Sequence, residues 1–591
     1  METESAENVG IEQNNGVQTD ETGDNQQVRQ DFNSDSNKIE ITNLGKFAYA
    51  ELRGLAKKLK LNPTKMKTKN HYGGRDHAFL CFRTAEEKEQ AKKLLTGYKW
   101  RGREISVKDA KAVLDPLLKR RLEEGSLDQN APKPKKFRKK TVLEATVPLA
   151  HIPYEEQLKR KEKECIKHLQ TYATAVKRAS LELRPLIQAN QKETGLPCVW
   201  HGIKEAPNTN GYRNKSEFAV GKNENGEKTV GFRLGAYSDG SVEVGSVNDL
   251  PHIPDRTKLA VKLFETYIQS SKYDVFCMEL YTGQFRQFTV RQSNATGEIM
   301  LIVGIHTTEI LDELEELIKD IVNYFTERVS NELNVTSIYI EEINKREIGQ
   351  TQNKVRHIYG SKYITDEILG LKFRISAQSF FQINTKSADV LYDLAIKMGK
   401  IDPNTTVLDI CCGTGSIGLC FAKHCKEVLG VEIIEEAIND AKFNAQENQI
   451  ENSKFYAGNC DDYIHSLVHE AENENLLAIV DPPRAGLQSR SKEALRNARG
   501  LNRFIYIACS PKAAMQNWID FSRPCSKSLK GYPFILKEAA AVDMFPHTDH
   551  IEMVLLFERQ SKSSETKNGT TSVRNENVLQ PTDTDKSLTA E

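Results

Sequence analysis

A glycine-rich loop followed by an acidic residue is the strongest chemical signal in this sequence. The run VLDICCGTGSIG at 407–418 predicts a strand, a turn with three glycines and the start of a helix. Glu432 stands 23 residues after Asp409, at the end of the next expected strand. This spacing matches the G-x-G-x-x-G fingerprint with an acid about 20 residues further on, which binds dinucleotides. The loop therefore predicts a cofactor that carries a ribose.

Acidic residues around this loop favour S-adenosylmethionine over a dinucleotide. A dinucleotide needs a helix N-terminus for its pyrophosphate, whereas S-adenosylmethionine has no phosphate and carries a zwitterionic methionine end. Asp409 precedes the loop, and a later strand, LLAIVDPP, ends in Asp481 just before Arg484. The two motifs together resemble the class I methyltransferase pattern. Glu432 would bind ribose hydroxyls in either cofactor, so a dehydrogenase or a bare Rossmann scaffold remains the alternative.

A cysteine and a glutamate at expected strand ends could do chemistry beside this cofactor. Cys509 ends the apolar strand FIYIAC, where a thiol opens onto the cleft and can be activated by dipoles or cations. The alternative for Cys509 is a small buried apolar side chain. Glu552 lies in the last strand, where a carboxylate among apolar residues is costly unless it is paired or used. The alternative for Glu552 is a strand-entry residue that points to solvent.

These two side chains are the parts that methylation of a uracil at carbon 5 requires. Carbon 5 is a poor nucleophile until a thiolate adds to carbon 6 and makes it enolate-like. A base must then remove the carbon 5 proton so that the thiolate can leave. Cys509, Glu552 and one S-adenosylmethionine site would supply the nucleophile, the base and the methyl donor.

The motifs of the last third of the chain resemble those of the tRNA (uracil-5-)-methyltransferase family. The resemblance in 373–559 rests on SFFQIN, LDICCGTG, VDPPR, IYIACSP and HTDHIEMV, and with GYRNKSEFAVG it extends over 146–559. It implies methylation of tRNA, with uridine 54 of the T loop as the target and messenger RNA left open. The family usually has Asn where this chain has Ser510, next to the cysteine. The iron–sulfur cysteine cluster of bacterial ribosomal-RNA relatives is missing, so no cluster is expected.

The resemblance also implies a role for each candidate residue. Cys509 would be the nucleophile and Glu552 the proton acceptor. The expected cofactor-binding residues are Gln382, Cys411, Gly413, Ser416, Glu432, Asn459 and Asp481. The expected RNA-binding residues in this part are Tyr212, Arg213 and Lys215, a basic loop with an aromatic that suits phosphates and a splayed base. Without the resemblance, a solvated turn explains that loop equally well.

The remaining cysteines and histidines give no metal site. The thiols of Cys411, Cys412, Cys420 and Cys425 are interpreted as small buried side chains. His547 and His550 stand at HxxH spacing, but no third and fourth ligands are apparent, so we interpret them as loop or orienting residues. The 11 cysteines form no CxxC pair, which indicates a reducing compartment, the cytosol or the nucleus.

Three folded stretches must position these residues, and together they predict a multidomain α/β protein. The stretch 38–110 reads β-α-β-β-α-β, 146–365 mixes strands with helices as an α+β domain, and 366–559 alternates strands with helices. The last pattern predicts a parallel, doubly wound, Rossmann-like sheet whose ligands bind at the carboxyl ends of its strands. Polar tails at 1–37 and 560–591 are expected to be disordered.

The first stretch resembles an RRM, the sheet on which aromatics stack with unpaired bases. ITNL at 41–44 and RDHAFLCF at 75–82 stand where the two RNP motifs would be, with Phe79 and a weaker His77 as stacking side chains. Glu40 replaces the aromatic of the first motif. A degenerate module for protein contacts or loose RNA affinity is the alternative.

Charge is balanced overall but segregated along the chain. Lys+Arg and Asp+Glu both number 82, yet 133–140 (KPKKFRKK), in a linker at 111–145, holds six bases. Such a run suits nuclear localisation or phosphate binding, although a solvated linker is the commoner meaning. No stretch approaches 18 apolar residues, so we expect no membrane-spanning helix.

Two rival functions stand beside a monomeric uracil methyltransferase. A cytosine carbon 5 RNA methyltransferase often carries a Pro-Cys pair where this chain has Asp481-Pro-Pro-Arg484. The other rival is an RNA-binding or folding helper with an inactive methyltransferase fold. The presence of both Cys509 and Glu552 argues against that helper.

Overall fold

A computed structural model describes most of the chain between its two tails. The described residues are 37–44, 49–63, 65–71, 74–82, 84–110, 140–235, 241–278, 281–344, 353–471, 475–484, 486–498, 500–527 and 529–559. The expectations for the N-terminal tail, the basic run before Lys140 and the tail from 560 therefore lie outside the described residues. None of the described helices is both long and apolar enough to cross a bilayer.

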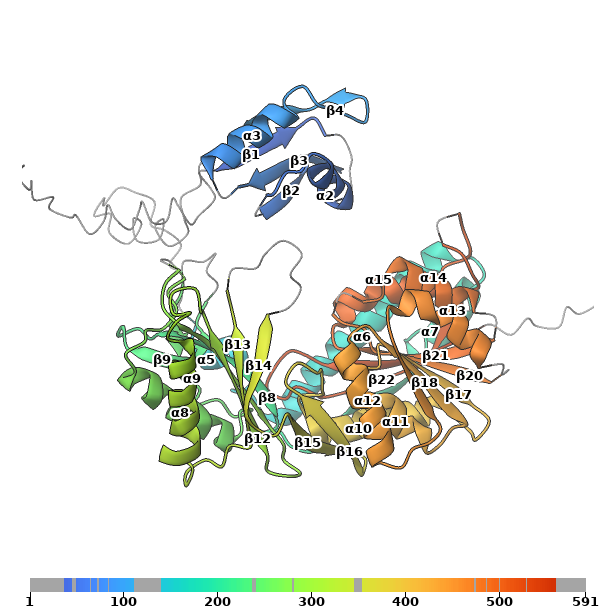
Figure 1. Ribbon diagram of the computed structural model, residues 1–591. Helices are drawn as coiled ribbons and strands as arrows, with labels where there is room; N and C mark the ends of the chain where they lie inside the picture. Colours follow the sequence, from blue (N-terminus) through green and yellow to red (C-terminus); the bar gives the residue numbers. More distant parts are fainter. Residues whose placement is uncertain are drawn as a thin grey trace, which may run out of the picture.

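The N-terminal unit is one antiparallel four-stranded sheet in the order β2-β3-β1-β6 (Figure 1). Its elements are β1 (Lys38–Thr42), α2 (Tyr49–Lys58), β2 (Lys65–His71), β3 (Gly74–Cys81), α3 (Ala85–Leu95), β4 (Lys99–Trp100), β5 (Arg103–Glu104) and β6 (Ser106–Asp109). Alternation puts apolar residues of β1 and β3, such as Ile39 and Leu80, into a core with both helices. Glu40 and Phe79, paired across the two strands, lie on the opposite face.

The central unit is a seven-stranded sheet in the order β10-β9-β8-β11-β12-β13-β14. Its elements are α5 (Val142–Thr146), β8 (Lys215–Lys222), β9 (Lys228–Arg233), β10 (Val244–Gly245), α8 (Asp255–Ser270), β11 (Phe285–Gln292), β12 (Ile299–Ile305), α9 (Leu314–Asn323), a π-helical turn (Tyr324–Arg328), β13 (Ser337–Glu342) and β14 (Lys354–Gly360). Helices α8 and α9 cover one face of the sheet and bury Leu301 and Val303 of β12 there. Met300 and Ile302 lie on the other face, in a core shared with the C-terminal unit.

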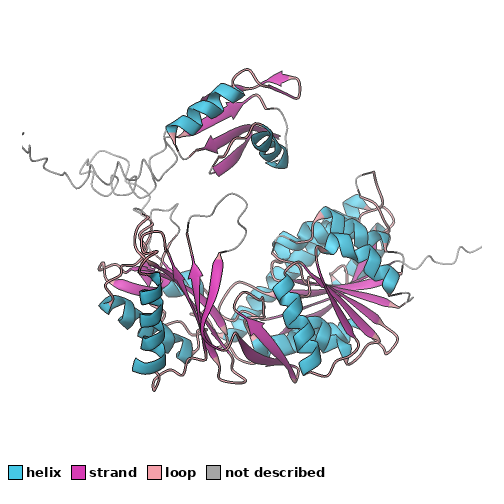
Figure 2. Ribbon diagram, in the orientation of Figure 1, coloured by secondary structure: helices cyan, strands magenta, loops and turns pink. Residues whose placement is uncertain are grey.

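The C-terminal unit is an eight-stranded sheet in the order β19-β18-β17-β20-β21-β23-β22-β7, with helices on both faces (Figure 2). Its elements are α6 (Tyr154–Ala179), α7 (Arg184–Thr194), β7 (Val199–Lys204), α10 (Thr385–Gly399), β17 (Thr406–Ile410), α11 (Ser416–Ala422), β18 (Glu427–Glu432), α12 (Glu435–Glu447), β19 (Ser453–Ala457), α13 (Cys460–Glu470), β20 (Leu476–Val480), α14 (Ser489–Asn497), β21 (Leu501–Ala508), α15 (Pro511–Ser522), β22 (Phe534–Val542) and β23 (Glu552–Arg559). A hairpin, β15 (Tyr363–Ile368) and β16 (Leu371–Ser376), connects it to the central sheet.

The structure differs from the sequence-based expectation in two respects. Residues 154–204, assigned to the central domain, pack on the C-terminal sheet: β7 pairs with β22, and Leu169 and Tyr172 of α6 join its core. The expected boundary at 365/366 also falls inside strand β15. The sheet is not wholly parallel, since β23 runs antiparallel to both β21 and β22. Local alternation of apolar residues cannot reveal either a distant pairing or a strand direction.

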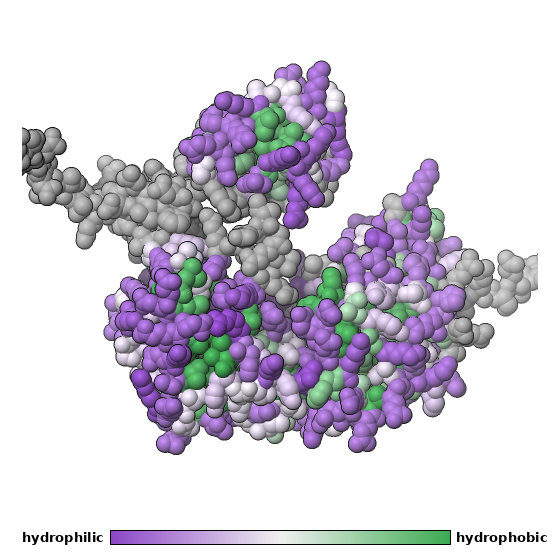
Figure 3. All heavy atoms as spheres, viewed as in Figure 1, coloured by the Kyte–Doolittle hydropathy of each residue, from purple (hydrophilic) through white to green (hydrophobic). Residues whose placement is uncertain are grey.

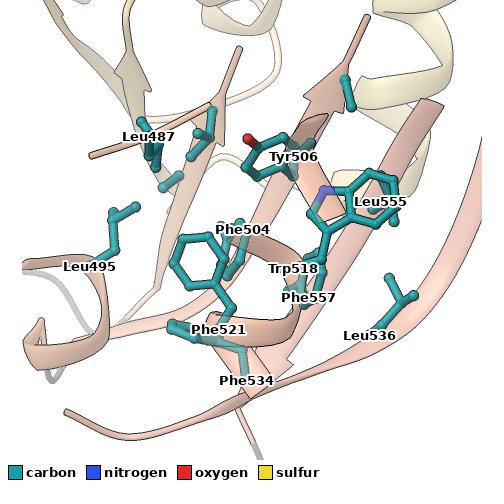
Figure 4. Packing of buried hydrophobic residues seen from close by; sticks show 14 of the residues in the cluster. Leu487, Leu495, Phe504, Tyr506, Trp518, Phe521, Phe534, Leu536, Leu555 and Phe557 are labelled. Carbon is teal, nitrogen blue, oxygen red and sulfur yellow. The ribbon is translucent and has the colours of Figure 1, made fainter. Parts of the chain in front are cut away.

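Buried aromatic side chains pack together beneath β21 and β23 (Figure 4). Phe504 stacks on Phe557 with ring centroids 4.8 Å apart, and Phe521 and Phe534 pack against the same pair. Fully buried aromatics dominate core energetics because each removes a large apolar area from water.

The visible face of the molecule is mostly hydrophilic, with apolar side chains exposed only in small patches (Figure 3).

Candidate active site

The acidic candidates and the cysteine lie in one row along the carboxyl edge of the C-terminal sheet. Register pairs Val431 with Ile410 and Ile410 with Val480, so the residues that follow them, Glu432 and Asp481, end neighbouring strands around the glycine loop. Ligands of doubly wound sheets bind at this edge, where loops diverge from the strands. The structure therefore brings together residues that are up to 143 positions apart in the sequence, Asp409 and Glu552.

The glycine loop is shaped by backbone conformations that side chains would obstruct. Gly415, with φ of 75°, is the left-handed residue that begins α11. Gly418 allows close packing, because a Cβ there would stand 2.7 Å from Asp409 Oδ2. Cys411 also adopts a positive φ, 66°, and its thiol is in hydrogen-bond contact with Cys460. The conformation of the loop therefore requires glycine at positions 415 and 418.

Asp409 is a fully buried carboxyl group beneath the loop. Its Oδ2 accepts a hydrogen bond from the Gly418 N–H at 2.8 Å, and its Oδ1 has no partner among the described protein atoms. Burial raises the pKa of Asp409 to about 7, against the lowering effect of that N–H. An orphaned carboxyl oxygen at this edge fits a ligand that carries hydrogen-bond donors or positive charge.

Glu432 is oriented by three backbone N–H groups. Its Oε1 accepts from Ile433 and Ile434 at 2.8 and 3.1 Å, and its Oε2 accepts from Gly413 at 3.2 Å. Each carboxylate oxygen can accept more than one hydrogen bond, so a ribose diol can still be bound. Asn459 lies nearby, because the Gly458 N–H before it donates to the Glu432 carbonyl at 2.8 Å.

Cys509 and Glu552 lie at neighbouring strand ends, because Cys509 directly follows β21 and Glu552 begins β23. Ala508 pairs with Met553 in the antiparallel β21–β23 ladder, so the next pair outward is Cys509 with Glu552. Residues directly opposite in such a ladder have Cβ atoms roughly 4.5–5.5 Å apart. Cys509 is half-buried, whereas Glu552 is 2% exposed and its Oε1 has no partner among the described protein atoms. One substrate base can therefore reach both groups.

Burial disfavours the anionic forms of the acids in this cluster in the free protein. Burial, followed by the charges of Glu552 and Asp481, raises the pKa of the Cys509 thiol to about 11. Burial and Asp481 raise the pKa of Glu552 well above its ordinary value, and burial raises the pKa of Asp481 to about 7. Perturbed pKa values of this kind concentrate at functional sites.

Comparisons with known proteins show which family this chain is similar to. Residues 317–560 match the family model described as tRNA (Uracil-5-)-methyltransferase. The human tRNA (uracil-5-)-methyltransferase homolog A is 38% identical over 538 residues, which cover 90% of this chain and 84% of that protein. The human homolog B is 35% identical over 427 residues, covering 71% of this chain and 84% of that protein.

The chain belongs to the tRNA (uracil-5-)-methyltransferase family. Membership makes it an RNA methyltransferase, which confirms the resemblance seen in the sequence motifs. Among solved structures, the Pyrococcus abyssi tRNA (uracil-54, C5)-methyltransferase in complex with S-adenosyl-L-homocysteine covers 69% of this chain and 84% of its own, at 21% identity and a TM-score of 0.47.

Arg484 is a further residue of the candidate active site, and the sequence motifs alone predict no role for it. It is exposed at the end of VDPPR, and its charge lowers the pKa values of both Cys509 and Glu552, against the effect of burial. It also faces His550, whose pKa burial and this cation lower. The motif containing Arg484 was recognised, but only the fold shows that it adjoins the cysteine.

Two of the expected cofactor residues are buried in the free protein. The Ser416 hydroxyl is bonded to Tyr392 of α10 at 3.0 Å and is 8% exposed, so its side chain belongs to the core. Gln382 is 6% exposed, in the segment between β16 and α10.

Among the described residues, no three His, Cys, Asp or Glu side chains form a metal-binding group. His547 bonds Gln157 and Asn210 instead.

The basic loop before β8 has one buried and two half-buried members. Tyr212 is 3% exposed and donates its hydroxyl to the Pro546 carbonyl at 3.0 Å, so in the free protein its side chain is buried and connects this loop to the segment before β23. Arg213 is half-buried and lies near Arg484, while Lys215 pairs with Glu217 at 2.8 Å. The GYRNK pattern has no helical or strand period that would have revealed the burial of its tyrosine.

On the N-terminal sheet, His77 and Phe79 are both half-buried on the face away from the core. The Lys38 ammonium lies 5.3 Å from the centre of the Phe79 ring, and Glu40 pairs with Lys108 at 3.3 Å. A basic face with one aromatic ring suits contact with single-stranded nucleic acid.

Proposed function

We propose that this chain methylates carbon 5 of uridine 54 in the T loop of tRNA, with S-adenosylmethionine as the methyl donor. The observation that carries the proposal is that Cys509, just after β21, and Glu552, the first residue of the neighbouring strand β23, lie close to each other and to Asp481. A thiol and a carboxyl group facing each other match the two steps that the reaction needs at one base. Neither a dehydrogenase nor a folding helper requires that pair.

The reaction begins when the Cys509 thiolate adds to carbon 6 of the uracil and makes carbon 5 nucleophilic. S-adenosylmethionine, when bound, would supply an electrophilic methyl group to carbon 5 and would be left as S-adenosylhomocysteine. Glu552, as carboxylate, then removes the carbon 5 proton, and the sulfur leaves carbon 6 as the ring regains its double bond. The adjacent Arg484 favours the anionic form of both groups and so offsets part of the burial cost.

Several side chains fit the proposed cofactor. Asp409 and Asp481 would provide negative charge near its sulfonium and ammonium groups, and Glu432 would accept from the ribose hydroxyls. We propose that Asn459, Gln382 and the glycine loop, through the backbone of Cys411 and Gly413, complete the pocket. The orphaned oxygen of Asp409 supports this fit.

We propose two RNA contacts outside the reaction centre. Arg213 and Lys215 would bind phosphates beside the target base, because a cationic loop next to Arg484 attracts the backbone. His77 and Phe79 would add loose contacts with unpaired nucleotides on the N-terminal sheet. The acceptor of the methyl group is expected to be cytosolic or nuclear tRNA.

The test is transfer of a labelled methyl group from S-adenosylmethionine to unmodified tRNA, followed by identification of the nucleoside. We expect 5-methyluridine, and none on a tRNA with cytidine at position 54. Cys509→Ala should abolish transfer but leave S-adenosylhomocysteine binding within about threefold, since the thiolate acts on the base. Cys525→Ala, which removes an exposed thiol, is the matched control and should keep full turnover. Substantial turnover by Cys509→Ala would contradict the covalent mechanism.

A further inference from the structure

The segment between β16 and α10 contains Gln382 and is held from outside its own domain. It runs from Ser376, the last residue of β16, to Thr385, the first of α10. Its Phe380 ring is 63% exposed, whereas Gln382 is 6% exposed. Four of its carbonyl groups accept hydrogen bonds from the central domain, two from Arg291 of β11 and two from Asn214, the residue before β8.

Arg291 of β11 fixes the beginning of the segment. Its Nη1 donates to the Ser376 carbonyl at 2.9 Å and its Nη2 donates to the Ser379 carbonyl. The guanidinium is 3% exposed, and burial lowers the pKa of Arg291 to about 10. Among the described residues it forms no ion pair. A planar fork of donors is the side chain that can bind two carbonyls at once.

Asn214 fixes the end of the segment. Its backbone N–H donates to the Ile383 carbonyl at 2.9 Å, and its Nδ2 donates to the Gln382 carbonyl at 2.9 Å and to Thr385 Oγ1 at 3.0 Å. The residue is 7% exposed. It lies next to Arg291 in space, because the Gln292 N–H donates to the Asn214 carbonyl at 2.8 Å.

The C-terminal domain itself holds the segment mainly through hydroxyl groups. Asp440 of α12 accepts from Ser376 Oγ at 3.0 Å and from Ser379 Oγ at 2.6 Å. The Ser376 carbonyl also accepts from the Ser379 N–H at 3.2 Å, whereas the donors to the carbonyls of Ser379, Gln382 and Ile383 come from the central domain. A buried carbonyl that loses its donor is destabilising, and the backbone would shift to find another.

We propose that Arg291 and Asn214 are positioning residues for cofactor binding, through which the central domain holds Gln382 in place. The inference rests on the proposed function, since Gln382 is a proposed cofactor residue. It gives the central domain a task that precedes RNA contact: the affinity for the cofactor depends on side chains of a sheet that does not form the cofactor pocket.

The experiment measures S-adenosylhomocysteine binding by calorimetry without RNA, together with KM for S-adenosylmethionine and kcat on tRNA. Arg291→Lys keeps the charge but loses the fork, and Asn214→Ala loses the side-chain donors. We expect each variant to raise the dissociation constant and KM by about 10-fold, the equivalent of one lost hydrogen bond, with kcat at saturation within about threefold.

Two matched controls separate positioning from general stability. Arg286→Lys changes another β11 arginine, which donates to the Ile343 carbonyl within the central sheet. Asn452→Ala removes another carbonyl-binding amide, bonded to Ala422 and Cys425 at the edge opposite the cofactor loops. Both should bind the cofactor as the wild type does, and unfolding in urea should show all four variants folded.

Three outcomes would overturn either this inference or the proposed function. Equal cofactor affinity in wild type, Arg291→Lys and Asn214→Ala overturns the inference and leaves the proposed function intact. Equal weakening in all four variants also overturns it, because the effect would then be a general loss of stability. A wild-type chain that binds no S-adenosylhomocysteine overturns the proposed function, and the inference with it.

Discussion

The thiol and the carboxyl group proposed to react are both disfavoured as anions in the free protein. Burial raises the pKa of Cys509 to about 11 and that of Glu552 well above its ordinary value. The charge of Glu552 raises the pKa of Cys509, and the charge of Asp481 raises the pKa values of both groups. Binding of a cationic cofactor beside Asp481 would relieve this, so the site would become reactive only when it is loaded.

Glu552→Gln should trap a methylated, covalent protein–RNA adduct. Methyl transfer precedes proton removal, and the amide is nearly isosteric but is no base at neutral pH. Loss of a general base typically costs on the order of 10²–10⁴ in rate, which is enough for the adduct to accumulate. A denaturing gel with labelled tRNA and S-adenosylmethionine should show a shifted band that disappears in the double variant with Cys509→Ala. Glu558→Gln, on the same strand, is the control; normal release of 5-methyluridine by Glu552→Gln would assign the proton to another group.

Cofactor affinity should fall as the pH drops below neutrality. Burial raises the pKa values of Asp409 and Asp481 to about 7, so both are carboxylates at pH 8 and become neutral near pH 6. A cationic ligand binds the charged form more tightly, and each group that must ionise weakens binding by up to about 10-fold per pH unit below its pKa. Calorimetry with S-adenosylmethionine at pH 6, 7 and 8 measures the slope. Asp481→Asn should make the slope shallower; an unchanged slope would exclude Asp481 as its source.

At the scale of elements, helix α6 determines where the loop before Glu552 lies. Lys161 of α6 pairs with Asp543 at 2.7 Å, with both side chains at most 1% exposed, and also donates to the Phe545 carbonyl at 3.0 Å. Gln157, one turn earlier, bonds both the backbone and the ring of His547. The loop 543–551 is therefore clamped to a helix almost 400 residues away in sequence.

Lys161→Met should destabilise the protein by about 3–5 kcal/mol, because it leaves the Asp543 carboxylate buried without its cation. Urea unfolding measures this loss. Adding Asp543→Asn should restore a large part of the stability, since the amide carries no charge to strand. Lys159→Met, which breaks only an exposed pair with Glu156 at 2.7 Å, should change stability by less than about 1 kcal/mol. Failure of the double variant to recover would mean that packing of the lysine stem carries the effect.

The sequence predicted elements well where periodicity is local. The glycine loop, strands β17, β18, β20 and β21 and the placement of Cys509 all follow from short motifs with a physical cause. The clamp by α6, the pairing of β7 with β22 and the burial of Tyr212 do not, because each is decided by a distant partner. The proximity of Arg484 to Cys509 belongs to the same class, since two strand ends meet only after the sheet forms.

At the scale of the whole molecule, the N-terminal sheet has a core of its own and contains neither of the two proposed catalytic residues. Removing residues 1–110 should weaken tRNA binding by roughly 10-fold to 10⁴-fold, the loss of one or two stacked bases, and should leave uracil methylation measurable. The loss should lie near the lower end, because the second expected stacking side chain, His77, is weaker than Phe79, and Glu40, paired with Lys108, offers no ring. Filter binding and turnover at saturating tRNA test this. Zero turnover at saturation would make the N-terminal unit part of the active enzyme.

Pairing of β7 with β22 has a consequence for how the chain is made on the ribosome. Strand β7 ends at Lys204, but its partner begins at Phe534, with the whole central sheet between them. At about 5–20 residues per second, translation leaves β7 and the apolar side of α6 waiting roughly 15–65 s for the rest of their domain. The central sheet, by contrast, is complete long before that. Nascent chains should therefore fold their middle first, and the unpaired edge of β7 is where a chaperone would be needed during synthesis.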